Sequence, residues 1–251
     1  MFSLERKKSL GQCFLHDKNI LILEAKLGNC SDKNVLEIGP GDGRLTEAIL
    51  SQNPKHLTIV EKDSRFAALL REKFANQNVT VIEGDFLEFP SNRFDVVFGN
   101  IPYYISSDII FRLKDFDFDL AILIVQKEFA QKMAQKPNTG NYGRLSVTSQ
   151  LFFDVKLERT ISRNLFRPSP RVDSALITLK PTKFKSSVFL ENIIRYLFSH
   201  KNKTVRNALL DSKQFSKEQL ECLDELASRR AKTLSKEECI KVAQTLQSSK
   251  V

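Results

Sequence analysis

A short polar and aromatic segment follows one of the apolar runs of this 251-residue chain. The segment "GNIPYYISSD" starts at Gly99, after the run "FDVVF", and contains an amide, a proline and two adjacent tyrosines. The Asn100 side-chain oxygen and a nearby backbone carbonyl, for which Ile101 is the candidate, can accept two N–H groups from one amine. Pro102 fixes φ and lacks a donor, so it would hold that carbonyl in place. Tyr103 can stack on a nucleic-acid base, which is worth about 1–3 kcal/mol. These residues are suited to binding a planar amine and aiming its lone pair.

Glycines and acidic residues follow three other apolar runs. The turn "EIGPGDG" at 37–43 has G-x-G-x-G spacing from Gly39, which differs from the G-x-G-x-x-G of dinucleotide-binding turns. Glu61 ends the next apolar run about twenty residues later, where an acid can accept hydrogen bonds from both ribose hydroxyls. Asp85 ends a third run and could accept from an adenine amino group, with Phe86 beside it. This pattern predicts a site for a nucleoside-like ligand.

The alternation of apolar and amphipathic segments predicts how these residues are positioned. Buried strands are expected at 34–39, 56–61, 78–84, 94–99 and 120–126, with helical spacing between them. Such alternation is typical of an α/β fold with a mostly parallel sheet and helices on both faces. Ligands bind at the carboxyl ends of the strands in such sheets, so the polar residues above should share one edge. Helices near 126–135 and 144–152 and two more strands, "DVKLERTI" and "SALITLK", are expected to follow.

The C-terminal part of the chain has a different character. A domain boundary is predicted near residue 182, dividing a catalytic domain at 1–182 from an all-α domain at 183–251. Four helices are expected in "VFLENIIRYLFSH", "KTVRNALLD", "SKEQLECLDELA" and "SKEECIKVAQTLQ", with Ser216 and Ser235 as N-caps. The chain carries a net charge of +9, of which +6 falls after residue 180. This asymmetry favours a polyanionic partner such as nucleic acid, although a solvated lysine-rich surface is the competing interpretation.

Composition restricts the classes of protein. The hydrophobic content of 41% is enough for a core. The four cysteines are scattered without a C-x-x-C pair, and the three histidines form no ligand cluster, so no metal site is predicted. The N-terminal segment lacks the apolar core of a secretory signal, and the longest apolar run is far too short to span a bilayer. We expect a cytoplasmic protein without membrane association, and a monomer.

Several motifs resemble known methyltransferases. The "EIGPGDG" turn resembles the first motif of S-adenosylmethionine (SAM) methyltransferases, and "NIPY" resembles the N/D-P-P-Y-type motif of enzymes that methylate exocyclic or amide nitrogens. Over nearly the whole chain, the sequence resembles the ribosomal RNA adenine dimethyltransferases. The segments that carry this resemblance, in the family's order, are "KKSLGQCFLHD", "EIGPGDGRLT", "VEKD", "GDFLEF", "GNIPYYISS", "NYGRLSVTSQLFFDV", "FRPSPRVDSALI" and "RAKTLSKEE".

The resemblance implies a Rossmann-like SAM-dependent methyltransferase fold with a small helical C-terminal domain. It implies dimethylation of N6 on two adjacent adenosines near the 3′ end of small-subunit rRNA during ribosome biogenesis. SAM would be the cofactor, S-adenosylhomocysteine the product, and the small ribosomal subunit with its rRNA the partner, with no metal. Together with the residue analysis, it predicts cofactor contacts at Gln12, Cys13, Leu15, Gly39, Glu61, Asp85, Phe86 and Asn100. Cys13 departs from the His or Asn of many members, which leaves a side-chain contact there in doubt.

Substrate and RNA contacts are predicted at two further places. Asn100, Tyr103 and Phe166 are the candidate catalytic residues, and Phe166 would stack on the flipped base opposite Tyr103. Flipping a base costs a few kcal/mol, which two stacking contacts could offset. The alternative interpretation of Phe166 is a core anchor beside a Pro-x-Pro turn. rRNA phosphates are expected to contact a set of basic residues in the C-terminal domain, namely Lys201, Lys203, Arg206, Arg229 and Arg230.

Three alternative functions stay open at this point. One related class methylates a large-subunit rRNA adenine and confers macrolide resistance, but the segments "RAKTLSKEE" and "FRPSPRVDS" favour the small-subunit enzymes. A non-catalytic rRNA-binding assembly factor is a second alternative, although such a binder has no need of Asn100 or Glu61. DNA adenine methylation is a third, weakened by the lack of an obvious sequence-reading domain.

Overall fold

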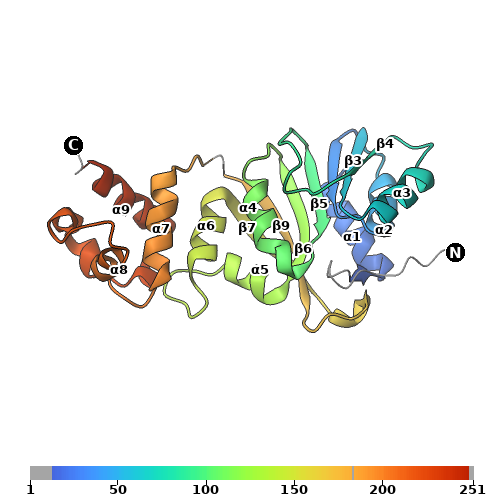
Figure 1. Ribbon diagram of the computed structural model, residues 1–251. Coiled ribbons are helices and arrows are strands. Elements are labelled where there is room, and N and C mark those ends of the chain that lie inside the picture. Colours follow the sequence, from blue (N-terminus) through green and yellow to red (C-terminus); the bar gives the residue numbers. More distant parts are fainter. Residues whose placement is uncertain (1–12, 183, 249–251) are drawn as a thin grey trace. The chain divides into compact units, whose positions relative to one another are not determined.

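The computed structural model describes residues 13–182 and 184–248 (Figure 1). The described residues form two compact units, one from residues up to Ala130 and from Val155–Pro181, the other from Gln131–Asp154 and the residues after Pro181. The predicted boundary at 182 left residues 131–154 in the first domain, whereas the structure groups them with the second unit. The reason is that helix α6 (Arg144–Phe152) packs against α7 (Val188–Ser199) and α9 (Lys236–Ser248).

A seven-stranded sheet with the order β4-β3-β2-β5-β6-β9-β7 forms the centre of the first unit. Strands β4, β3, β2, β5 and β6 pair in parallel, and β9 is antiparallel to β6. The strand bounds are β2 (Asn34–Ile38), β3 (His56–Glu61), β4 (Val79–Glu83), β5 (Val96–Asn100), β6 (Leu120–Gln126), β7 (Phe153–Ile161) and β9 (Ser174–Pro181). The five parallel strands confirm the prediction, and the Rossmann-like fold class is confirmed with them.

The central strands are almost continuously apolar because both faces of the sheet are covered. Leu36 in β2, Phe98 in β5 and Leu123 in β6 are fully buried. The register aligns the carboxyl ends of these strands, with Ile38 opposite Gly99 and Asn100 opposite Ile124. The residues that follow each strand therefore meet at one edge of the sheet.

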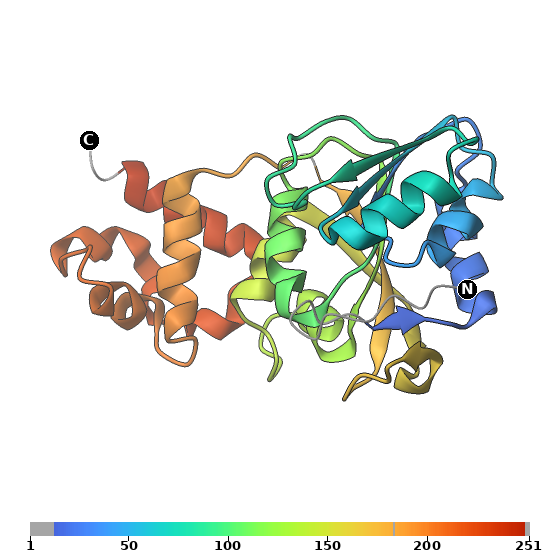
Figure 2. The same ribbon diagram turned by 45° about the vertical axis from the view of Figure 1, so that its right-hand side comes forward.

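Helices α1 (Lys18–Gly28), α2 (Arg44–Leu50), α3 (Ser64–Lys73), α4 (Ser106–Leu113) and α5 (Lys127–Met133) complete this part of the fold (Figure 2). The sequence analysis assigned no element to 18–28, where the structure places α1. The Asp17 side chain caps this helix by accepting the Ile20 N–H at 3.0 Å. Helix α1 packs against α2 and β6, and α3 packs against β3 and β4.

One reversed strand and a pair of short strands bring distant sequence to the same edge of the sheet. Because β9 runs antiparallel to β6, its first residue, Ser174, lies opposite Gln126, the last residue of β6. The strand β1 (Phe14–Leu15) pairs with β8 (Phe166–Arg167), which places Leu15 opposite Phe166. Phe14, Leu15 and the start of β9 therefore join the carboxyl edge of the parallel strands.

The second unit is helical, with α6, α7, α8 (Val205–Asp211) and α9. Ser235 caps α9 as predicted, because its Oγ accepts the Glu238 N–H at 3.2 Å. The segment "SKEQLECLDELA" differs from the expected α-helix: Glu218–Ser228 forms 3₁₀ turns, broken at Asp224 where φ is 44°. Its apolar residues repeat at three- and four-residue intervals, which suits the buried face of either helix type. Within the two described ranges, no helix is long and apolar enough to cross a membrane.

Candidate active site

A pocket of about 700 Å³ opens at the carboxyl edge of the parallel strands. The sequence-predicted cofactor and catalytic residues that line it are Cys13, Leu15, Gly39, Glu61, Asp85, Phe86, Asn100, Tyr103 and Phe166. Gln12 lies outside the described residues. The structure thus brings together residues from β1, β3, β5, β8 and the segments after β2, β4 and β5, all within the first unit.

The glycine-rich turn bends sharply between β2 and α2. Gly39 donates its N–H to the Val60 carbonyl at 2.9 Å, which ties the turn to β3. Gly41 has a φ of 58°, in the left-handed region that favours glycine. A Cβ built at Gly41 would lie 2.4 Å from Cε1 of Phe14, so the turn also needs glycine for the close approach of β1.

Glu61 is a buried carboxylate held by the backbone of two loops. Its Oε2 accepts the Gly41 N–H at 3.1 Å, and its Oε1 accepts the Asp63 N–H at 2.8 Å. Only 6% of the residue is exposed, and this burial raises the pKa of Glu61 even though the two N–H groups act in the opposite direction. The carboxylate is fixed at the pocket wall, where it can accept hydroxyl groups of a ligand.

Asp85 supplies a second acceptor on the same wall. Its Oδ2 lies 2.6 Å from the Lys62 ammonium, and its Oδ1 accepts the Leu87 N–H at 3.0 Å. Burial tends to raise the pKa of Asp85, but these two contacts outweigh it and lower the pKa. Phe86 stacks on Phe116 with ring centroids 5.1 Å apart, so an apolar surface adjoins the carboxylate.

Asn100 and Tyr103 occupy the end of β5. The Tyr103 hydroxyl contacts the Ser174 hydroxyl at 2.7 Å and donates to the Val172 carbonyl at 3.3 Å. These contacts from the start of β9 fix the ring plane at the pocket wall. The Asn100 Oδ1 is buried and has no hydrogen-bond partner among the described residues. An unpartnered acceptor here agrees with the predicted recognition of an N–H donor.

Phe166 also lines the pocket, and only 6% of it is exposed. Its backbone is held by the pairing with Leu15, and the preceding Leu165 carbonyl accepts the His16 N–H at 2.9 Å. Both the stacking and the core-anchor interpretations remain compatible with this position, because the ring belongs to the apolar core and borders the cavity.

Sequence reasoning missed several pocket residues. Tyr104, 61% exposed, and Arg171 border the cavity beside the predicted residues. Ser174, the partner of Tyr103, could not be recognised because its place depends on the direction of β9. Glu37 was noted only as a motif residue: it is 1% exposed, accepts from the Thr46 hydroxyl at 2.7 Å, and burial raises its pKa to about 8.

The predicted RNA-binding residues lie in the second unit, and four of the five make contacts within it. The Lys201 ammonium donates to the carbonyls of Gly140 and Tyr142 at 2.9 and 3.0 Å. Lys203 pairs with Asp211 at 2.6 Å. These contacts hold the loop before α8, so the two lysines have a structural role whatever else they bind.

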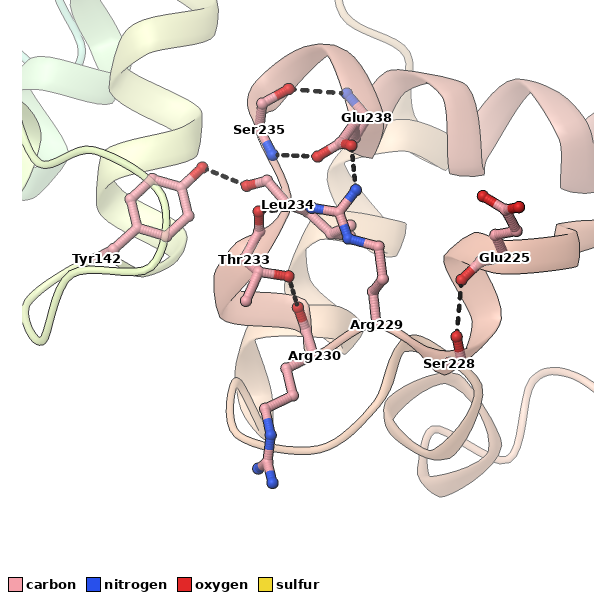
Figure 3. A network of polar contacts seen from close by, with 9 residues as sticks. All are labelled: Tyr142, Glu225, Ser228, Arg229, Arg230, Thr233, Leu234, Ser235 and Glu238. Atoms are coloured by element: carbon pink, nitrogen blue, oxygen red, sulfur yellow. Dashed lines mark hydrogen bonds and ion pairs between the residues drawn. The ribbon is translucent and has the colours of Figure 1, made fainter.

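The two arginines of "ASRRAK" are also engaged. Figure 3 shows Arg229 paired with Glu238, which also accepts the Ser235 N–H, while the Tyr142 hydroxyl donates to the Leu234 carbonyl. Arg230 donates to the Asn202 carbonyl at 2.6 Å. Arg206 is exposed, and no side-chain partner for it occurs in the described part of the unit. RNA contact by these five residues stays a prediction.

The parallel sheet, the glycine turn and the acids at the strand ends define a Rossmann-like methyltransferase. A crystal structure of a dimethyladenosine transferase from Plasmodium falciparum superimposes with a TM-score of 0.85 at 28% identity, covering 95% of this chain and 98% of that one. The 23S rRNA methyltransferase ErmE gives 0.68 at 27% identity, covering 93% and 99%. Residues 3–248 match the family model described as ribosomal RNA adenine dimethylase.

The chain therefore belongs to the ribosomal RNA adenine dimethylase family. A relative from Methanothermobacter thermautotrophicus, described as a probable ribosomal RNA small subunit methyltransferase A, is 42% identical over 214 residues, which cover 84% of this chain and 77% of the relative.

Proposed function

We propose that this protein transfers methyl groups from SAM to N6 of two adjacent adenosines near the 3′ end of small-subunit rRNA, with S-adenosylhomocysteine as product. The observation that carries the proposal is the meeting of Asn100, Tyr103 and Phe166 in the pocket that also contains Glu61 and Asp85. The relatives named for the small ribosomal subunit support the choice of substrate. A cytoplasmic monomer acting on the immature subunit is part of the same proposal.

The residues at the glycine turn fit the cofactor. The buried carboxylate of Glu61 suits the two ribose hydroxyls, and Asp85 suits the adenine amino group, with Phe86 against the ring. The absence of a side chain at Gly41 leaves the turn close to Phe14 and lets the backbone line the cavity. Bound SAM would supply a methyl group on a positively charged sulfur.

Asn100 would act on the target amine. The lone pair of an adenine N6 is conjugated into the ring, which makes the amine a poor nucleophile. Hydrogen bonds from N6 to the Asn100 Oδ1 and to a backbone carbonyl would localise that lone pair and direct it. Tyr103 and Phe166 would hold the base on its two faces. Alignment, rather than a strong base, is the main requirement of this step.

RNA binding is proposed for the second unit. Arg206 is the first candidate because its guanidinium has no competing partner in the described structure. The other four residues already donate hydrogen bonds within the protein, so only their remaining N–H donors could bind phosphates: Lys201, Lys203, Arg229 and Arg230. The first unit is proposed to be catalytic, and the second unit is proposed to bind rRNA.

The experiment is methyl transfer from labelled SAM to immature small ribosomal subunits, followed by mass spectrometry of the digested nucleosides. The wild type is compared with Asn100→Ala and with Asn19→Ala, an exposed asparagine of α1 outside the pocket. N6,N6-dimethyladenosine from the wild type and from Asn19→Ala, but not from Asn100→Ala, is expected. Equal product from Asn100→Ala would overturn the role given to Asn100.

The same assay separates the remaining functions. Tight subunit binding without product from the wild type would favour a non-catalytic assembly factor. With large-subunit rRNA added as a second substrate, product on that RNA alone would favour the large-subunit rRNA methyltransferases, a class to which the structural similarity with the 23S rRNA methyltransferase ErmE also points. The 42% identity with a relative named for the small subunit favours the proposed substrate.

A further inference from the structure

Helix α1 carries a carboxyl group on its buried face. Glu24 is 0% exposed, and neither Oε1 nor Oε2 has a hydrogen-bond partner within residues 13–182 and 184–248. The other buried residues on this helix include Leu21, Ala25 and Gly28. Burying a carboxyl group without a partner is costly, so an apolar residue would stabilise the helix better. Fold stability alone does not account for Glu24.

The packing of α1 places Glu24 beside the end of β5. Leu21, one turn before it, lines the same pocket as Asn100. Gly28, one turn after it, packs so closely on β5 that an added Cβ would lie 2.5 Å from the Phe98 ring. The face of α1 therefore runs from the pocket to the middle of β5, and Glu24 lies between these two contacts, beneath the pocket floor.

Two more unpartnered polar atoms lie at this floor. Asn100 Oδ1 and Glu37 Oε1 are buried and, like the Glu24 oxygens, have no hydrogen-bond partner in the described structure. Burial and the nearby Glu37 raise the pKa of Glu24 well above its usual value, while the Asn100 amide lowers it. An amide acts in that direction when its N–H faces the carboxyl group, so the Asn100 amide lies near the Glu24 carboxyl, without a hydrogen bond between them in the described structure.

The two groups are chemically complementary. The Glu24 carboxyl keeps an acceptor oxygen whether or not it is protonated, and that oxygen can accept an N–H of the Asn100 amide. The oxygen and nitrogen ends of a primary amide are nearly identical in shape. Only the oxygen end can accept an N–H group from a target amine. The rotation of the amide therefore decides whether it binds that amine, and a polar partner below it would restrict the rotation.

We propose that Glu24 is a positioning residue that sets the orientation of the Asn100 side chain from beneath the pocket. The inference rests on the proposed function, because it gives Glu24 a role only if Asn100 binds the target amine. Glu24 does not touch the substrate. Its effect is expected in the rate of methyl transfer, since alignment of the amine is what Asn100 supplies, and a misplacement of about 1 Å can cost roughly a hundred-fold in rate.

The test compares Glu24→Leu with Glu24→Gln in the full-length protein. Leu removes the polar partner and fills the space, so the unfolding temperature should rise or stay unchanged while kcat falls by about ten-fold or more. KM for SAM should change by less than about three-fold, because the cofactor contacts remain. Gln keeps one donor and one acceptor edge, so it should recover most of the activity lost in Glu24→Leu. Higher stability with lower activity is a combination that a merely structural residue would not give.

Two further variants make the result decisive. Ile20→Val trims a buried apolar residue of α1 and should lower the unfolding temperature without changing kcat. In an Asn100→Ala background, whose residual rate is measured with high enzyme concentration and long incubation, Glu24→Leu should cause no additional loss, because Glu24 acts through Asn100. Wild-type kcat in Glu24→Leu, or an equal loss with and without Asn100, would overturn the inference. If Asn100→Ala keeps full activity, both the role proposed for Asn100 and the inference about Glu24 are wrong. If Asn100→Ala is impaired but Glu24→Leu is fully active, only the inference about Glu24 is wrong.

Discussion

The carboxyl groups near the pocket floor share an unusual electrostatic state. Burial raises the pKa of Glu24, Glu37 and Glu61, so these side chains retain protons more readily than exposed acids. For Glu37 the pKa reaches about 8. This state has a measurable consequence for the stability of the protein without cofactor.

The free energy of unfolding should decrease with rising pH because of Glu37. Between its ordinary pKa of 4.5 and the folded value of about 8, the folded protein holds a proton that the unfolded chain has released. The stability contributed by Glu37 is therefore complete below about pH 4.5 and is lost as the pH rises through 8. Relative to Glu37→Gln, which has no such proton, the wild type should lose about 2 kcal/mol between about pH 6 and about pH 8. Urea denaturation at the two pH values measures the difference. A pH-independent difference would mean that Glu37 is ionised in the folded protein.

Glu61 is predicted to control cofactor affinity. Its two oxygens hold the Gly41 and Asp63 N–H groups, so Glu61→Gln puts an NH₂ group against one of these donors and also removes an acceptor for the ribose. The loss of one charged hydrogen bond costs about 1.5–3 kcal/mol, which corresponds to roughly ten- to hundred-fold in Kd. Calorimetric titration with S-adenosylhomocysteine measures the change. Glu47→Gln is the matched control, since Glu47 is exposed and lies outside the pocket; equal Kd values for both variants would contradict the role of Glu61.

Loops and short strands around the glycine turn act as one structural element. Gly39 and Gly41 both have left-handed φ values, of 64° and 58°, but their surroundings differ. A Cβ at Gly39 would meet nothing within 4 Å, whereas a Cβ at Gly41 would collide with the Phe14 ring of β1. The pairing of β1 with β8 transmits that displacement toward Phe166.

Gly41→Ala should therefore lower the stability of the protein more than Gly39→Ala does. Both variants carry the backbone cost of about 1–2 kcal/mol for a left-handed alanine. Only Gly41→Ala should in addition displace β1 and so lower the unfolding temperature further. Thermal unfolding of the two variants provides the comparison, because Gly39 is itself a predicted cofactor contact and cofactor affinity would not separate them. Identical losses in both would show that the contact with Phe14 has no effect.

Across the whole chain, the excess of positive charge is unevenly distributed, and several of the basic side chains already make contacts within the protein. The net charge of +9 is concentrated after residue 180, but Lys201, Lys203, Arg229 and Arg230 make contacts that stabilise the second unit. Their loss would affect folding and RNA binding together. Arg206, exposed and without a partner in the described unit, offers a cleaner measurement.

Arg206→Ala should weaken rRNA binding without lowering the unfolding temperature. Loss of one phosphate contact should reduce the slope of log affinity against log salt by about 0.7–1. Arg229→Ala should instead lower stability by about 1 kcal/mol, because it breaks the pair with Glu238 and the bond to the Thr233 carbonyl. Filter binding across a salt series and thermal unfolding separate the two effects. An unchanged slope in Arg206→Ala would mean that this side chain is only solvated.

Local patterns in the sequence were sufficient to predict the parallel strands and the functional residues at their ends. The apolar runs fixed the five strands, and the rule that parallel strands share a carboxyl edge predicted that Glu61, Asp85 and Asn100 would lie together. These inferences succeed because each depends on nearby residues and on a general property of parallel sheets.

Other features depend on contacts between segments that are distant in sequence. The direction of β9 decides that Ser174 reaches Tyr103, and the pairing of β1 with β8 decides that Leu15 meets Phe166. Helix α6 joins the second unit through its packing on α7 and α9, so the observed division of the chain differs from the boundary predicted at residue 182. Glu24 is an ordinary helix-forming residue in the sequence; it acquires its significance only because the packing of α1 leaves the carboxyl buried, unpartnered and near Asn100. Burial and partnership are properties of the packed chain, and no local pattern encodes them.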